Sequence, residues 1–196
     1  MTKSKTQTEH ALTKFGDLSV KQGRLVIGGC FASDLAEKYG TPLYILDVNR
    51  VKKTALAYVE VLKREYPDFT VCYASKAFCC AGIYSIIAPL GLGADVVSGG
   101  ELYTAIKGGM DPAKIYFHGN NKTENEIIYA LENGVECFVV DSELELSLIS
   151  KHAKTPQNVI VRVNPGVEAH THKFIQTTTP DSKFGFSIAD GTAEKI

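Results

Sequence analysis

Several polar residues that could do chemistry stand at or just beyond the ends of short apolar runs. Lys76 follows the run TVCYA, Asp95 lies within ADVVS, and His118 ends KIYFH. Asp141 and Arg162 stand near the ends of two further runs. Lys76 is the most unusual of them, because its flanks are apolar and an unpaired buried ammonium group is costly. We expect it either to extend its amine to water or to use that amine in chemistry.

A lysine in such a place has one specific chemistry open to it. A neutral lysine amine can form a Schiff base with a carbonyl compound. The carbonyl could belong to the substrate, as in an aldolase, or to the cofactor pyridoxal phosphate (PLP). The residues alone leave both uses open, and a lysine that follows a strand can also be only a salt-bridge partner.

Short β-rich runs that recur about every 22 residues position these side chains. They are residues 70–74, 94–98, 114–118, 137–141 and 159–163. Patterns typical of helices lie between and after them, at residues 78–89, 100–109, 123–133 and 142–152. Thr123 and Glu126 predict a capping box at the third helix. Ser142 predicts an N-cap for the fourth, with Glu143 and Glu145 in the first turn, where acids complement the helix dipole.

This alternation predicts an α/β fold with a parallel sheet covered by helices. The regular spacing favours a (β/α)8 TIM barrel over an open doubly wound sheet, although spacing alone does not exclude the latter. A closed barrel has eight units and about 250 residues. We therefore expect an incomplete barrel of about five to six βα units, as part of a longer protein, with a compact five-stranded protein as the alternative. The final residues, ADGTAEKI, are typical of the first turn of a helix.

A separate strand and helix segment is predicted before this array. Residues 20–28 are strand-like, and residues 39–47, YGTPLYILD, contain a turn and then a strand-like run. Residues 49–66 have the apolar stripe of a long helix.

Composition excludes several classes of protein. The chain has 44% hydrophobic and 22% charged residues and a net charge of −1, which is typical of a globular domain and predicts neither a nucleic-acid nor a membrane partner. No apolar run approaches the roughly 20 residues that a membrane helix needs. The first ten residues are polar and lack the apolar stretch of a secretory signal.

The cysteines and histidines predict neither a disulfide framework nor a metal site. The five cysteines are odd in number and mostly lie in apolar segments, as expected for reduced thiols in a cytoplasmic protein. The adjacent Cys79 and Cys80 are a poor metal pair, and His170 and His172 have no third ligand at a suitable spacing.

Several segments closely resemble the diaminopimelate decarboxylases, a PLP-dependent family related to the ornithine and arginine decarboxylases. They are YGTPLYILD, VCYASKAF, LGLGADVVSGGELYTAIKGGM, IYFHGNNKT and VRVNPGVEAHTHKFIQTTTPDSKFGFS. The resemblance extends over roughly residues 30–187. YASKA is shared with the relatives, whereas VNPGVEAHTHKFI and DSKFGF are much more specific to the diaminopimelate branch.

The resemblance implies an alanine-racemase-like PLP barrel and a C-terminal β domain. It assigns residues 1–38 to a tail and a segment of the β domain, and residues 39–196 to part of the barrel. The implied reaction is that of a carboxy-lyase, which converts meso-2,6-diaminopimelate to L-lysine and carbon dioxide in the last step of lysine biosynthesis. The resemblance also implies the cofactor PLP and a homodimer of the full-length protein.

Residue by residue, the resemblance makes Lys76 the lysine that binds PLP covalently. Asp95 and Glu101 match an acidic pair near the lysine and the cofactor. Arg162 matches an arginine close to the pyridine side of the cofactor, and His118 matches the HGN turn that lines the pocket. Alternatively, Asp95 and Arg162 are paired charges of the barrel interior, and His118 is a hydrogen-bonded turn residue.

The resemblance places other parts of the site outside residues 1–196. These are the HIGSQ-type motif with the histidine that stacks on the PLP ring, the Gly-rich phosphate loop, the Glu-Pro-Gly-Arg segment, and a cysteine-bearing segment from the partner subunit. We therefore expect this chain alone to have little or no decarboxylase activity. Residues 168–181 are expected to form a mobile loop over the active site.

Two other functions stay open. One is a related decarboxylase that acts on ornithine, arginine or a carboxylated polyamine such as carboxynorspermidine, against which HTHKFI argues. The other is a non-catalytic regulator built on the same barrel and binding a partner protein. Such a regulator would be expected to lose the reactive lysine, and Lys76 is present.

Overall fold

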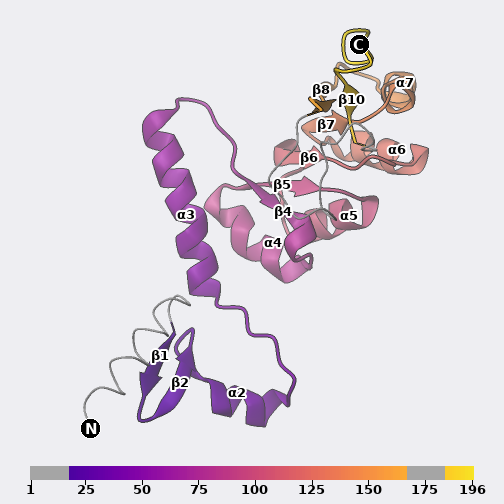
Figure 1. Cartoon of the computed structure of the whole chain (residues 1–196). Coiled ribbons are helices and arrows are strands. Elements are labelled where there is room, and N and C mark those ends of the chain that lie inside the picture. Colours follow the sequence, from indigo (N-terminus) through magenta and orange to yellow (C-terminus); the bar gives the residue numbers. More distant parts are fainter. Residues whose placement is uncertain (1–17, 167–183) are drawn as a thin grey trace. The chain divides into compact units, whose positions relative to one another are not determined.

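The computed structural model describes residues 18–166 and 184–196 and divides into two compact units, Met1–Pro67 and Asp68–Ile196 (Figure 1). The predicted division at residue 38 stays a prediction. No helix within the described ranges has both the length and the apolar character needed to cross a membrane.

A small antiparallel sheet opens the first unit. Its strands are β1 (Ser19–Lys21), β2 (Arg24–Ile27) and β3 (Cys30–Phe31), in that order. Residues 20–28 were predicted as one strand, and this is wrong, because a two-residue turn divides them. Gln22 and Gly23 both have positive φ, 54° and 75°, as the tight turns of hairpins require.

Two helices complete the first unit. Helix α2 (Ala32–Tyr39) follows β3, and α3 (Val48–Glu65) confirms the predicted long helix. The Asp47 carboxylate caps α3 by accepting hydrogen bonds from the backbone N–H groups of Asn49 and Arg50.

The strand-like run predicted within residues 39–47 is not a strand in the structure, and this prediction is wrong. Residues 40–47 contain no strand in the structure. Leu43, Tyr44, Ile45 and Leu46 are all exposed, and Tyr44 completely so. A strand needs a neighbour for its backbone hydrogen bonds, and the described residues offer this segment none.

The second unit is built on a five-stranded parallel sheet of order β4-β5-β6-β7-β8. The strands are β4 (Cys72–Ala74), β5 (Gly93–Val96), β6 (Ile115–Phe117), β7 (Cys137–Val140) and β8 (Asn158–Val161). Each falls within or beside one of the predicted runs. Since every strand pairs with the next one along the chain, the order has no switch point of the doubly wound kind. The partial barrel is therefore confirmed.

Helices follow the strands as predicted (Figure 1). They are α4 (Ala81–Ile87), α5 (Gly99–Lys107), α6 (Glu124–Asn133) and α7 (Glu143–His152), together with the 3₁₀ turns η1 (Ser75–Ala77), η2 (Ala88–Leu90) and η3 (Pro112–Lys114). The predicted capping box of Thr123 and Glu126 is present, and Ser142 caps α7.

A separate two-stranded parallel sheet follows β8 along the chain. Strand β9 (Val163–Asn164) pairs with β10 (Phe186–Ser187). Arg162 lies between β8 and β9 and hydrogen-bonds through its backbone to Val140 and Phe186. The final residues, predicted as the first turn of a helix, form hydrogen-bonded turns instead, with Lys195 N donating to Thr192 O.

The core of the second unit lies between its strands and helices. Phe117 of β6 and Phe138 of β7 are register partners, and their fully buried rings stack 5.9 Å apart. Tyr84 and Ile87 of α4 and Leu102 of α5 are also almost completely buried. Each large apolar side chain buried in this way contributes about 2 kcal/mol, and together they fix the strand ends.

Candidate functional site

The carboxyl ends of the parallel strands bring most of the predicted site residues to one edge. Lys76 lies in η1 directly after β4, and Asp95 lies in β5, where its neighbour in register is Ala74. His118 comes one residue after β6, and Arg162 one residue after β8. This is the edge at which barrel proteins place their chemistry.

Lys76 has an exposed side chain at this edge. Within the described residues its amine makes no hydrogen bond or ion pair, although its charge acts on the carboxyl of Asp95. The preceding Ser75 is fully buried and has no hydrogen-bond partner for its hydroxyl there. The turn after β4 thus buries Ser75 and leaves the amine of Lys76 uncommitted among the described residues.

Asp95 and His118 form the polar centre of the edge. His118 Nε2 lies 3.7 Å from Asp95 Oδ1, and both side chains are partly buried. Burial raises the pKa of Asp95, and the charges of His118 and Lys76 counteract it. Burial lowers the pKa of His118, which favours the neutral imidazole. Oδ1 of Asp95 is buried and has no hydrogen bond within the described residues, which makes it the unsatisfied acceptor of this pair.

Asp95 and Arg162 each lie near a side chain that can carry the opposite charge. Asp95 faces His118, whereas Arg162 Nη1 lies 3.8 Å from Asp141 Oδ2. The alternative of paired charges fits both residues, with Asp141 as the partner of Arg162 because register places it there, and their contact with a cofactor stays a prediction. Asp141 was predicted to end its strand but not as a site residue; its side chain is 3% exposed, and neither carboxylate oxygen has a hydrogen bond within the described residues.

Glu101 stands on α5 and turns toward its own loop. Its carboxylate accepts a hydrogen bond from Val97 N at 2.8 Å. Its own N–H donates to the Ser98 hydroxyl, the N-cap of α5. The structure thus assigns Glu101 the local task of shaping the β5–α5 loop. Its contact with the cofactor stays a prediction.

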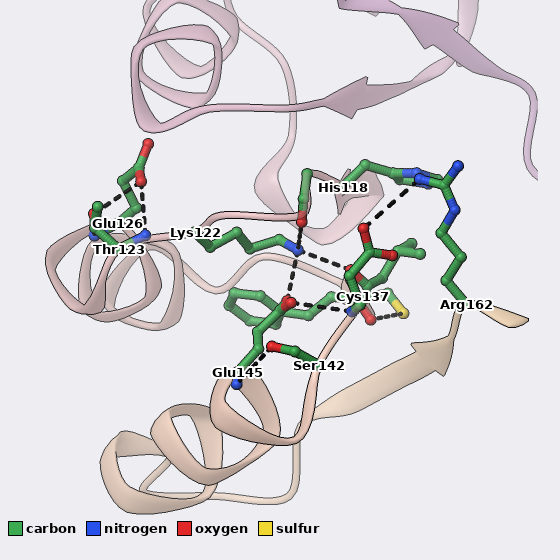
Figure 2. A network of polar contacts seen from close by, with 12 residues as sticks. His118, Lys122, Thr123, Glu126, Cys137, Ser142, Glu145 and Arg162 are labelled. Atoms are coloured by element: carbon green, nitrogen blue, oxygen red, sulfur yellow. Dashed lines mark hydrogen bonds and ion pairs between the residues drawn. The ribbon is translucent and has the colours of Figure 1, made fainter. Parts of the chain in front are cut away.

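A buried ion pair was missed from the sequence. Lys122 Nζ lies 2.5 Å from Glu145 Oε1, and the two side chains are 1% and 5% exposed (Figure 2). Glu145 was predicted as an acid in the first turn of this helix, where it lies, but its burial against Lys122 was not predicted. One signal was present: Lys122 stands four residues beyond His118 in the HGNNK segment.

These side chains suit a cofactor that carries an aldehyde and a group able to donate a hydrogen bond. The free amine of Lys76 could bind the aldehyde, and the carboxyl oxygens of Asp95 and Asp141 are unsatisfied at the edge. The guanidinium of Arg162 adds a positive charge. The described residues contain no group of three metal-ligating side chains. The loop predicted at residues 168–181, with His170 and His172, lies outside the described residues.

Comparisons with known proteins agree with this chemistry. The chain is 46% identical over 175 residues to diaminopimelate decarboxylase from Staphylococcus aureus, covering 89% of this chain and 42% of the relative. It is 44% identical over 178 residues to the Bacillus subtilis enzyme of the same name, covering 89% and 40%. The predicted resemblance to this branch is confirmed.

Solved structures show the same likeness. The crystal structure of diaminopimelate decarboxylase from M. jannaschii in complex with L-lysine matches with a TM-score of 0.83 and 42% identity, over 92% of this chain and 43% of that one. The chain thus spans about two fifths of the length of the relatives it matches. Residues 48–196 match the family described as pyridoxal-dependent decarboxylase, pyridoxal binding domain. The chain therefore belongs to the pyridoxal-dependent decarboxylases, through their pyridoxal-binding domain.

Proposed function

We propose that the protein carrying this chain uses PLP to decarboxylate meso-2,6-diaminopimelate to L-lysine. The observation that carries the proposal is the uncommitted amine of Lys76, which stands at the carboxyl edge of the sheet beside the carboxyl of Asp95. The names of the similar proteins and the L-lysine in one related structure support the choice of substrate.

Each residue at the edge has a role that follows from its surroundings. Lys76 holds the cofactor covalently through its amine. Asp95, next to it, accepts a hydrogen bond or a proton from that amine at Oδ1, which is otherwise unsatisfied. His118 stays neutral and lines the pocket, and Arg162 places positive charge near the cofactor ring. When bound, PLP supplies the electron sink that takes up the electron pair left by carbon dioxide.

Further features of the whole protein belong to the same proposal. We propose that residues 39–196 form part of the PLP barrel, that residues 1–38 belong to the β domain, and that the full-length protein is a homodimer. The free state of all five cysteines supports a cytoplasmic location. The net charge of −1 supports a small-molecule substrate in preference to nucleic acid.

A substrate comparison tests the proposal. Carbon dioxide release by the intact protein with PLP is measured from meso-diaminopimelate, ornithine, arginine and carboxynorspermidine. We expect the first substrate to be favoured in kcat/KM by about 100-fold or more, since a site built for a second polar group rejects analogues that lack it. Preference for another substrate would assign the protein to a related decarboxylase. Failure of the intact protein to bind PLP, together with no turnover of any substrate, would favour the non-catalytic regulator.

A further inference from the structure

We propose that the buried Lys122–Glu145 pair is a positioning device, which holds the loop of residues 118–122 and thereby fixes the place of His118 at the carboxyl edge. The expected effect on kcat rests on the proposed function. The positioning of the loop rests only on the contacts of Lys122 and Glu145.

Lys122 is saturated with hydrogen bonds. Its ammonium group has three N–H donors, and it donates to Gly119 O at 2.8 Å, Val139 O at 2.8 Å and Glu145 Oε1 at 2.5 Å (Figure 2). Its cation also lies 5.4 Å from the centre of the buried Phe117 ring. One side chain therefore ties the loop after β6 to the end of β7 and the start of α7.

Glu145 completes the connection. Its second carboxylate oxygen accepts a hydrogen bond from Asp141 N at 3.1 Å, and its own N–H donates to the Ser142 hydroxyl. Burial raises the pKa of Glu145, and the hydrogen bond and charge of Lys122 counteract it. The carboxylate thus orients both Lys122 and the backbone of Asp141, the residue that faces Arg162.

The loop between His118 and Lys122 has little freedom on its other side. His118 N donates to Val96 O of β5 at 2.8 Å. Gly119 has φ of +110°, and a Cβ there would lie 2.9 Å from Val97 O. The loop therefore packs against the end of β5 on one side, and Lys122 ties it to β7 and α7 on the other. We infer that these two sets of contacts together fix the backbone that carries the His118 imidazole.

The free-energy cost of burying the charges of Lys122 and Glu145 supports a positioning role for the pair. Replacement of a buried ion pair by apolar residues of similar size is often neutral or stabilising, so the pair adds little to overall stability. What apolar residues cannot do is bind the carbonyl oxygens of Gly119 and Val139, which Lys122 satisfies. We infer that the pair is useful because it fixes geometry.

The charge of Lys122 also acts on His118. The imidazole is faced by Asp95 from β5, Lys122 from its own loop, Asp141 after β7 and Arg162 after β8. The two carboxylates favour the protonated ring, and the two cations oppose it. Loss of Lys122 removes one opposing cation, so His118 should take up a proton more readily.

The test uses the double variant Lys122→Met/Glu145→Leu in the intact protein, because the single variant Lys122→Met leaves a buried carboxylate unpaired and could fail to fold. The control is Lys151→Met, which removes a lysine bonded to the exposed Glu124. The readouts are the NMR titration of the His118 ring, assigned with His118→Gln, and kcat and KM for meso-diaminopimelate. A second variant, Glu145→Gln, keeps Lys122 in place but cannot accept both hydrogen bonds through its single oxygen.

We expect the double variant to remain folded, with the His118 titration moved to higher pH and kcat lowered about 10- to 100-fold at little change in KM, the size of a small misplacement in an active site. Glu145→Gln should lower kcat in the same direction. An unchanged titration and unchanged kcat in the double variant would overturn the proposal. If the parent protein does not decarboxylate this substrate, the proposed function fails, and the positioning role is then judged by whether the nuclear Overhauser contacts of the His118 ring change in the double variant, since the titration alone also reports the lost charge of Lys122.

Discussion

Lys76 and Lys122 both follow strands of the same parallel sheet, and their surroundings are opposite. The ammonium group of Lys122 is buried and donates to three oxygen atoms. The amine of Lys76 is exposed and has no hydrogen bond or ion pair to any described residue. Lys76 comes two residues after β4 and Lys122 five residues after β6, and the difference in their surroundings arises from the partners that the fold provides.

The comparison separates the lysine that we propose to react from one that holds structure. A covalent bond to an aldehyde needs an amine that can lose its proton and leave its partners at little cost. Lys122 would have to abandon a buried carboxylate and two backbone carbonyls, which is strongly unfavourable. Lys76 has no such bonds to break within the described residues, and its charge acts on the carboxyl of Asp95. The fold thus leaves uncommitted the lysine to which we assign the covalent chemistry.

The largest expected effect is the loss of decarboxylation when Lys76 is replaced. Lys76→Ala should abolish covalent retention of PLP and lower decarboxylation by on the order of 10³-fold or more, as for loss of other covalent catalysts. The matched control, Lys76→Arg, keeps a cation beside Asp95 but has no amine that can react. Absorption spectra after dialysis and initial rates measure both effects. Retention of the cofactor by Lys76→Ala would show that another lysine holds it.

Removal of the structural lysine should instead act on stability. Lys122→Met leaves Glu145 buried without its cation and should lower the free energy of unfolding by about 3–5 kcal/mol. The double variant Lys122→Met/Glu145→Leu should recover only part of this loss, because neither charge then remains buried but the carbonyl oxygens of Gly119 and Val139 lose the bonds from Lys122. Lys151→Met, at an exposed pair, should cause no measurable change. Urea unfolding of the four proteins gives these values, and equal losses for Lys122→Met and Lys151→Met would contradict the account.

A smaller effect on stability is expected from a change of pH, through the imidazole of His118. Burial lowers the pKa of folded His118 below the ordinary value of 6.5, so the unfolded chain takes up a proton first as the pH falls. His118 therefore contributes stability that is present above about pH 6.5 and is lost as the pH falls below it. Asp95, whose pKa is raised, acts in the opposite sense at more acidic pH.

The measurement is the difference in unfolding free energy between the parent protein and His118→Gln from pH 8 to pH 5. The stability of the parent should fall relative to the variant as the pH drops through this range. A difference that is constant with pH, or that grows in favour of the parent at low pH, would show that burial does not disfavour the imidazolium.

The sequence predicts the parallel strands, the helices between them and the place of Lys76, because these follow from local periodicity and from strand ends. It does not predict which charges meet. Glu145 has the position of an ordinary first-turn acid, and only tertiary packing brings it against Lys122, 23 residues earlier in the chain. The register of the strands decides that Arg162 faces Asp141 instead of Asp95. The segment 40–47 has a strand-like composition, but it has no neighbouring strand among the described residues.

The most direct test of the contrast between the two lysines is to map where PLP attaches. The intact protein is mixed with PLP, reduced with borohydride and digested, and the modified lysines are identified by peptide mass. We predict a stoichiometric adduct on Lys76 and none on Lys122, with Lys122 becoming reactive only after unfolding in urea. An adduct on Lys122 in the folded protein, or labelling of Lys76 no greater than that of the exposed Lys151, would contradict the assignment of the reactive and the structural lysine.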